Sequence, residues 1–377
     1  MLITNAKAWL DGVFIYPFCV RLGDGCIAQA APALSPLPGE AVLDLGGDYL
    51  LPGFVDVHIH GYRGHDTMEG EVSIRAMSRD LYREGVAAFL PTTMSASRQE
   101  TLQAVAGTRA VLAQQEKNGA RVLGLHMEAP FLNPKRAGAQ RRRYLCDPSM
   151  ETLLSLTGGS PEGIRLLTLA PERKGAEHFI RALRDNGITV SLGHTEADGA
   201  LTHQAADWGA DHITHTFNAQ SPLGHREPGV PGAALTDDRF YCEMIADGVH
   251  LHRDTVRLMV RAKGPEKVVA ITDAMEAAGM PEGRYALGGY RVEVRNGQAR
   301  LTNGTLAGSV LTLRRALENL IHLFGIAPEA AVRMCTLTPA ESIGETLAGR
   351  IAPGAPLPLT RWSPDWRMTG IVDGTQA

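Results

Sequence analysis

Short apolar runs recur along the chain, and most of them are separated by stretches long enough for a helix. This alternation of strand-like and helix-like segments is typical of a parallel sheet covered by helices. Eight repeats predict an α/β fold whose sheet closes into a (β/α)8 TIM-like barrel, with a doubly wound open sheet as the alternative. The eight runs are Phe54–His60, Val86–Thr92, Val122–Glu128, Ile164–Glu172, Thr189–His194, His212–Phe217, Glu243–His250 and Val268–Asp273.

Helical periodicity is clearest in two segments. After the second run, Ser97-x-x-Glu100 has the form of a capping box, and the residues behind it predict one buried helical face. That face consists of Leu102, Val105, Ala106, Leu112 and Ala113. Leu313, Leu317, Leu320, Ile321 and Phe324 have the same kind of spacing and predict a helix that packs on the barrel.

The two ends of the chain follow a different pattern. Residues 1–50 contain short strand-like pieces broken by Gly and Pro, and similar pieces recur near residues 290–302 and 370–374. We therefore predict a small β-sandwich domain formed from residues 1–50 and 341–377, beside a metal-dependent hydrolase barrel over residues 51–340. The pieces at about 285–302 are candidate strands of the small domain.

Six imidazole or carboxylate side chains stand at or near the ends of the predicted strands. The carboxyl ends of barrel strands meet at one face, and two residues spaced two apart on a strand point to the same side. Histidine and carboxylate are ligands that zinc, iron and manganese all accept. The sequence thus predicts a divalent-metal site, with zinc as the first choice. Its candidate ligands are His58, His60, Glu128, His194, His215 and Asp273.

Each of these residues also has a simpler interpretation. A buried histidine is commonly a hydrogen-bonded core residue, Glu128 could pair with an arginine, and Asp273 could cap the next helix. Their shared position at strand ends favours the metal. Asp273 beside such a site suits a general base that later acts as general acid. With no plausible serine or cysteine nucleophile, the residues indicate hydrolysis of an amide-like or ester-like bond by metal-activated water.

Three further residues are candidates for substrate recognition, namely Asn218, Arg226 and His250. Arg226 lies in a polar loop after the sixth run, and an arginine binds phosphate or carboxylate through two parallel hydrogen bonds. The alternative is a surface arginine paired with Glu227. The run 141–143, three arginines, is interpreted as a solvated loop face.

Composition narrows the classes of partner. A formal charge of −4 gives no reason to expect nucleic acid or an anionic membrane. The chain starts without a signal-peptide pattern, and its five cysteines lack CxxC spacing. Reduced thiols and a cytoplasmic protein are therefore expected.

A set of motifs resembles the N-acetylglucosamine-6-phosphate deacetylase family of the amidohydrolase superfamily. The first-strand segment 52–61 carries the superfamily signature, and later motifs are specific to the family. Those motifs are Gly64-x-Asp66–Thr67–Met68, Pro91–Thr92–Thr93, His126–Phe131, Leu169–Glu172, Gly193–Thr195, Thr214–Ala219, His225–Gly229, Ala246–His250, Thr272–Ala274 and Leu306–Ser309.

The resemblance implies a (β/α)8 barrel with a small β-domain and a homodimer that deacetylates a phosphorylated amino sugar. Glu128, His194 and His215 match the constant metal site, and His58 with His60 matches the pair that supports a second ion in some members. One or two ions per subunit are therefore expected. Asp273 matches the catalytic acid/base. The residues matched to substrate binding are Gln140, Asn218, Ala219, Arg226, His250 and Leu306, with Arg226 reaching the other subunit's site.

Departures from the family pattern fall around the substrate rather than the metal. Ala129 replaces a usual glycine, Gln140 stands where a substrate-facing histidine is usual, and Ala307 replaces a frequent serine. A glutamine still donates a hydrogen bond but carries no charge. The hexosamine is therefore left open between N-acetylglucosamine 6-phosphate, N-acetylgalactosamine 6-phosphate and another amidohydrolase substrate.

Overall fold

Eight parallel strand positions form the centre of the computed structural model, which describes residues 1–375. Each of the eight predicted runs contains strand, so their number and order are confirmed. Most strands are buried on both faces, as expected where helices cover a parallel sheet. They are β6 (Phe54–Ile59), β9 (Val86–Pro91), β10 (Arg121–Val122) with β11 (Leu125–Met127), β12 (Ile164–Leu169), β13 (Thr189–Leu192), β14 (His212–Ile213), β15 (Tyr241–Ile245) and β16 (Val268–Ile271).

The strands form two ladders that together make a curled parallel sheet. One ladder has the order β10-β9-β6, and the other runs β11-β12-β13-β14-β15-β16. Isolated parallel bridges join Thr92 to His126 and Ile59 to Ala274. The first links the strand ends of β9 and β11, and the second links those of β6 and β16. The third strand is divided because Gly124, with φ +141°, lies against Arg165, where a Cβ would be 2.6 Å from the Arg165 Cβ.

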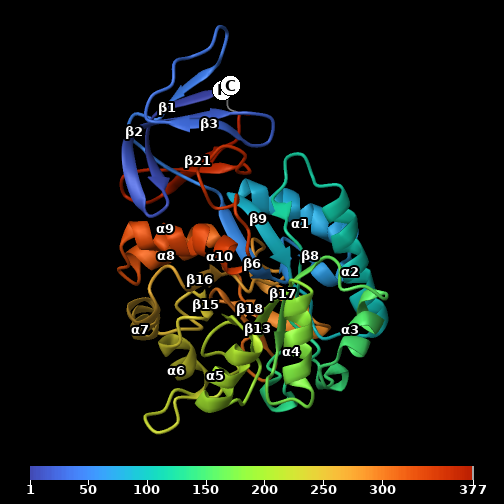
Figure 1. Cartoon of the computed structure of the whole chain (residues 1–377). Helices are drawn as coiled ribbons and strands as arrows, with labels where there is room; N and C mark the ends of the chain where they lie inside the picture. Colours follow the sequence, from blue (N-terminus) through green and yellow to red (C-terminus); the bar gives the residue numbers. More distant parts are fainter. Residues whose placement is uncertain (376–377) are drawn as a thin grey trace.

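Helices separate successive strands and cover the outside of the sheet (Figure 1). In chain order they are α1 (Glu71–Arg83), α2 (Arg98–Ala113), α3 (Met150–Thr157), α4 (Ala176–Asp185), α5 (Gly199–Trp208), α6 (Gly229–Thr236), α7 (Arg253–Lys263), α8 (Leu313–His322), α9 (Pro328–Cys335) and α10 (Leu337–Ser342). Short 3-10 turns lie at Thr67–Glu69, Pro134–Arg136 and Arg142–Tyr144. Among the described residues no helix combines the length and the apolar character that crossing a bilayer requires.

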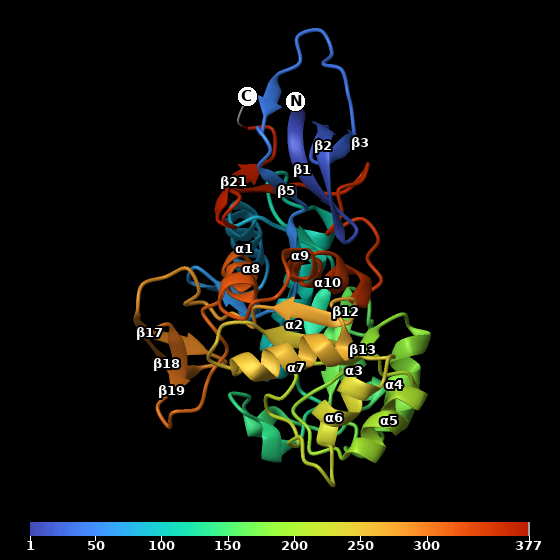
Figure 2. The same ribbon diagram turned by 90° about the vertical axis from the view of Figure 1, so that its left-hand side faces the viewer.

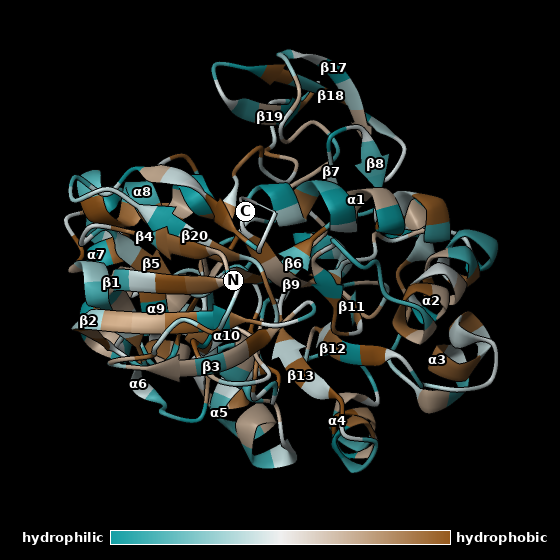
Figure 3. Ribbon diagram, turned by 90° about the horizontal axis from the view of Figure 1, so that it is seen from above, coloured by the Kyte–Doolittle hydropathy of each residue, from teal (hydrophilic) through white to brown (hydrophobic). Residues whose placement is uncertain are grey.

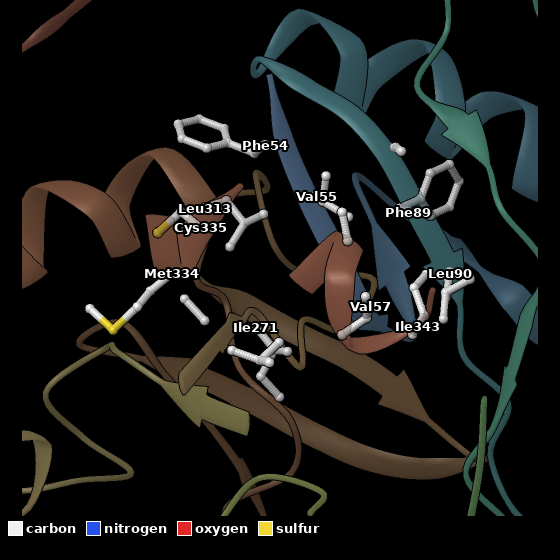
Figure 4. Packing of buried hydrophobic residues seen from close by; sticks show 14 of the residues in the cluster. Phe54, Val55, Val57, Phe89, Leu90, Ile271, Leu313, Met334, Cys335 and Ile343 are labelled. Atoms are coloured by element: carbon white, nitrogen blue, oxygen red, sulfur yellow. The ribbon is translucent and has the colours of Figure 1, made fainter. Parts of the chain in front are cut away.

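Side chains from distant parts of the sequence share one apolar core. Figure 4 shows Phe54, Val55 and Val57 of β6 in one cluster with side chains of β9, β16, α8 and α9. Coloured by hydropathy, the central strands and the surrounding helices both carry apolar and polar residues (Figure 3). Of the predicted face, Leu313, Leu317, Leu320 and Phe324 are buried and Ile321 is half-buried, which confirms the predicted packing of α8 and the residues that follow it.

The capping box of α2 is present, but part of the predicted buried face is wrong. Ser97 accepts from the backbone N–H of Glu100, whose side chain returns to Ser97. Ala106 and Ala113 are exposed, and the buried positions are Thr101, Ala104, Val105, Gly107, Thr108 and Val111. The reason is the close approach of the α1 start at Gly107, where a Cβ would lie 2.3 Å from the backbone nitrogen of Glu71.

A seven-stranded sheet joins the two ends of the chain, coloured blue and red in Figure 1. Its order is β21-β20-β5-β1-β2-β3, and β4 also pairs with β1. The last two residues of the predicted segment 341–377 lie outside the described part of the chain. The strands are β1 (Leu2–Leu10), β2 (Val13–Leu22), β3 (Ile27–Ala31), β4 (Val42–Asp44), β5 (Tyr49–Leu51), β20 (Leu359–Trp362) and β21 (Met368–Val372).

The pieces near residues 285–302 do not join that sheet, so this expectation is wrong. β17 (Gly283–Leu287), β18 (Tyr290–Arg295) and β19 (Gln298–Leu301) form a separate three-stranded antiparallel sheet. Figures 2 and 3 show it apart from the chain-end strands, beside the short hairpin β7 (Gly61–Tyr62) and β8 (His65–Asp66) in Figure 3. It has its own apolar cluster, which includes Met94, Met275 and Leu287.

Candidate metal centre

The six predicted ligands come together at the carboxyl ends of the strands. His58 lies in β6, His60 and Glu128 directly follow β6 and β11, and the other three lie two residues beyond their strands. Those three are His194 after β13, His215 after β14 and Asp273 after β16. All six side chains are buried.

Glu128, His194 and His215 form one ligand group. Oε1 of Glu128 lies 3.2 Å from Nε2 of each histidine, and the two Nε2 atoms are 3.1 Å apart. The three donor atoms surround one point. Imidazole nitrogens and a carboxylate oxygen in this arrangement are suited to bind one metal ion.

His58, His60 and Asp273 form a second group beside the first. Oδ1 of Asp273 lies 3.1 Å from Nε2 of His60 and 3.4 Å from Nε2 of His58. Glu128 borders both groups, because its Oε1 is 3.5 Å from Nε2 of His58 and its Oε2 is 3.4 Å from Nε2 of His60. A carboxylate between two groups of imidazoles can serve two ions.

Two of the histidines form a hydrogen bond through the ring nitrogen that faces away from the centre, and this bond orients the ring as a metal ligand. Nδ1 of His60 lies 3.2 Å from the carbonyl oxygen of Thr92, and Nδ1 of His194 lies 2.8 Å from that of Arg136. A carbonyl only accepts, so each Nδ1 carries the proton and each Nε2 presents a lone pair to the centre. The donor set therefore fits a divalent metal.

The charges of the centre reinforce this fit. Burial lowers the pKa of His58, but the carboxylates of Glu243, Asp273 and Glu128 outweigh it and raise that pKa to about 10. Burial raises the pKa of Glu128, yet the charge of His58 and the neighbouring imidazoles of His194 and His215 hold it well below its ordinary value. The centre thus favours ionised carboxylates and a positive charge among them.

A cavity of about 500 Å³ opens onto the centre. The ligands His60, Glu128, His194, His215 and Asp273 line it. So do five predicted substrate residues, Gln140, Asn218, Ala219, His250 and Leu306.

Arg226 and Gln140 differ from the other predicted substrate residues in their surroundings. Arg226 is exposed on a loop and does not line the cavity of its own chain. Gln140 lines the cavity, but its amide is already engaged: Oε1 accepts from the backbone N–H of Ser95 at 2.6 Å, and Nε2 donates to Oε2 of Glu128. Because the Ser95 N–H can only donate, the orientation of the Gln140 amide is fixed.

Other groups at the site were not predicted. Lys135, Arg136 and Arg300 line the cavity, and the first two pair with Glu196. A third cluster, His58 with His126 and Glu243, lies among the buried side chains. Glu243 was detectable, because a carboxylate inside the apolar run of β15 is costly to bury without a partner.

Comparison with known proteins identifies the family. The model of the amidohydrolase family matches residues 49–374. The chain belongs to the amidohydrolase family. In agreement with this, its buried His, Glu and Asp groups offer donor sets for a divalent metal.

Curated relatives within this amidohydrolase group are sugar-phosphate deacetylases. An N-acetylglucosamine-6-phosphate deacetylase of Bacillus subtilis is 41% identical, over 80% of this chain and 77% of the relative. An N-acetylgalactosamine-6-phosphate deacetylase of Escherichia coli O157:H7 is 37% identical, over 93% of this chain and 91% of the relative.

Solved structures of similar amidohydrolases agree over nearly the whole chain. N-acetylglucosamine-6-phosphate deacetylase from Pasteurella multocida superposes with a TM-score of 0.90 at 30% identity, covering 99% of this chain and 98% of that one. The Mycobacterium smegmatis enzyme, an aspartate-to-alanine variant in complex with N-acetyl-D-glucosamine-6-phosphate, gives 0.89 at 31% identity, covering 99% and 97%.

Proposed function

We propose that this chain hydrolyses the acetamide of N-acetyl-D-glucosamine 6-phosphate, giving D-glucosamine 6-phosphate and acetate. The observation that carries the proposal is one cavity lined both by members of the two ligand groups, Asp273 among them, and by polar groups suited to a sugar phosphate. Relatives with this activity, at 41% identity and at a TM-score of 0.90, support the substrate class.

The proposed metal ligands are Glu128, His194 and His215 for one ion, and His58, His60 and Asp273 for a second. Zinc is the first choice, and iron or manganese would suit the same donors. A divalent metal held by these residues would supply Lewis acidity for the scissile carbonyl and would lower the pKa of water toward neutral pH.

Asp273 is the proposed acid/base. Burial raises its pKa, but the charge of His58 and the neighbouring imidazole of His60 hold the pKa below its ordinary value. Its carboxylate is therefore ionised at neutral pH and accepts a proton from the attacking water. It then donates that proton to the sugar nitrogen as the C–N bond breaks, so acetate and the amine leave.

Backbone geometry supports phosphate binding near Asn218 and Ala219. His215, Phe217 and Ala219 have φ of 29°, 77° and 52°, so left-handed residues alternate along this turn. Such alternation gathers backbone N–H groups into a concavity suited to anions. The N–H of Ala219 donates to no acceptor within residues 1–375. Nδ1 of His250 lies 2.7 Å from Asp247, which leaves Nε2 for the substrate.

The same chemistry on N-acetylgalactosamine 6-phosphate is the second candidate. The Escherichia coli relative with that activity aligns with 93% of this chain, more than the 80% of the Bacillus subtilis relative. Gln140, already bonded to Glu128 and Ser95, leaves sugar recognition to other groups of the cavity.

We also propose the architecture and assembly around this site. The curled sheet closes as a (β/α)8 barrel, supported by the bridge of Ile59 to Ala274 between its first and last strands. Residues 1–50 and 341–375 form a small β-domain, of sandwich type in this proposal, supported by the pairing of β1 with β4 and β5 and of β20 with β5. A homodimer in which Arg226 reaches the other subunit's cavity accounts for its exposed loop. Five unpaired cysteines support a cytoplasmic location.

Acetate release tests the proposed function. Enzyme of counted metal content is given N-acetylglucosamine 6-phosphate, N-acetylgalactosamine 6-phosphate or unphosphorylated N-acetylglucosamine. Rapid release from one phosphorylated sugar with little from the free sugar is expected. Asp273→Asn should lose nearly all turnover while the ion at Glu128, His194 and His215 remains. No release from any substrate by metal-loaded enzyme would leave an amidohydrolase of another substrate.

A further inference from the structure

Beneath the ligand groups lies a carboxylate that no step above uses. Glu243 stands in the middle of β15, between Cys242 and Met244, and is 0% exposed. A charged side chain at such a position is rare unless a partner compensates it.

One oxygen of Glu243 contacts a member of each ligand group. Its Oε2 lies 2.9 Å from Nδ1 of His58 and accepts from the backbone N–H of His215, also at 2.9 Å. With Nδ1 of His58 protonated toward this carboxylate, Nε2 presents its lone pair to the point that it shares with Nε2 of His60 and Oδ1 of Asp273. A carboxylate in this place orients the ring and increases the basicity of the ligating nitrogen.

We propose that Glu243 is the positioning residue that makes the His58–His60–Asp273 group bind a cation, and that it aligns this group with the one containing His215. The inference rests on the proposed metal ligands. It concerns the ion count rather than the substrate.

The charge balance around Glu243 supports this role. Among residues 1–375 the ion-pair partners of Glu243 are His58 and His212, and Nε2 of His212 lies 3.4 Å from Oε1. Within the same described residues, no Lys or Arg forms an ion pair with Glu243. Oε1 has no hydrogen-bond partner in the described part of the chain. A positive ion held by His58 would therefore compensate a negative charge that otherwise has only imidazoles beside it.

Glu243→Gln separates charge from hydrogen bonding. Both donors reach the same oxygen, so the amide oxygen of glutamine can keep both hydrogen bonds while the charge is lost. The assay is metal stoichiometry in zinc buffers of graded free concentration, with thermal unfolding of the metal-free proteins beside it.

The expected result is two ions per wild-type chain, and one of them bound about 10- to 100-fold more weakly in Glu243→Gln. Metal-free Glu243→Gln should unfold at or above the wild-type temperature, because a buried charge has been removed. Ser191→Ala is the control, since this buried hydroxyl on β13 bonds to Thr214 and contacts no proposed ligand. It should keep both ions at wild-type affinity.

Several outcomes would overturn the inference. The inference fails if Glu243→Gln binds two ions with wild-type affinity. It also fails if the wild type binds a single ion and Glu243→Gln binds that ion equally well. If Glu243→Gln does not fold, Glu243→Asp is the second variant, because it keeps the charge on a side chain that is one methylene shorter. Unchanged affinity of Glu243→Asp for both ions would also contradict the inference. Weakened metal binding in an enzyme inactive on every phosphosugar would sustain the role of Glu243 and refute only the proposed function.

Discussion

Adding one methyl group at Gly193 should displace a metal ligand. Gly193 directly precedes His194, and an added Cβ would lie 2.7 Å from Cβ of Thr214 and 2.8 Å from Cγ2 of Thr168. Ordinary carbon–carbon contact is about 3.5–4.0 Å, so these contacts are about 1 Å too short. Both threonines are buried and their hydroxyls bond to each other at 2.8 Å, so neither can turn away freely. The end of β13 must move instead.

The magnitudes follow from this geometry. Overpacking of this kind costs about 1–3 kcal/mol. An unfolding entropy of about 2.1 cal/mol/K per residue gives about 0.8 kcal/mol/K for 377 residues, so the melting temperature should fall by about 1–4 K. A ligand misplaced by about 1 Å can cost about 100-fold in rate. Gly193→Ala should therefore lose activity and metal far more than stability.

The assay combines acetate release, metal content and thermal unfolding. Gly370→Ala is the control: Gly370 lies in β21, and nothing stands within 4 Å of its added Cβ. That variant should match the wild type in all three measurements. Wild-type metal content and turnover in Gly193→Ala would refute the argument that the packing of these strands sets the position of His194.

Three further outcomes are expected. Dialysis against a chelator should abolish turnover and lower the melting temperature, and zinc should restore both. Gly107→Ala, with its Cβ 2.3 Å from the nitrogen of Glu71, should lower the free energy of unfolding by about 1–3 kcal/mol in urea while the metal content stays constant. Hydrogen bonds from Arg21 and the Leu37 backbone lower the pKa of Glu40 from 4.5 to about 2, so this carboxylate stabilises the fold above pH 4.5 and that stability is lost toward pH 2. Glu40→Gln should therefore be less stable at pH 6, in urea unfolding, with the difference vanishing near pH 2.

The central strands and the ligands were predictable for a common physical reason. Parallel strands buried on both faces leave continuous apolar runs, so β6, β9 and β16 can be read directly from the sequence. Because the carboxyl ends of such strands meet, polar residues at those ends meet as well. His58 and Asp273, 215 residues apart in the chain, were placed together by this argument alone and lie 3.4 Å apart.

Features that depend on contacts between elements were not predictable in the same way. The buried face of α2 is set by the approach of Glu71 to Gly107, which the period of α2 does not contain. β17–β19 alternate as any antiparallel strands do, so the pattern shows strands but not which sheet they join. The arrangement of Gln140 depends on a hydrogen bond from Ser95, 45 residues away.

Backbone conformation at the centre explains why these residue types occupy these positions. His194, His215 and Asp273 have φ of 46°, 29° and 49°, so all three are in the left-handed region although none is glycine. Such residues cost about 1–3 kcal/mol each and concentrate at functional sites. Histidine and aspartate are among the non-glycine residues enriched there. The left-handed turn ends each strand and redirects the side chain toward the centre, so ligand chemistry and backbone geometry favour the same residues. Asparagine tolerates this region too, and His194→Asn therefore removes the imidazole with less disturbance of the backbone than His194→Ala.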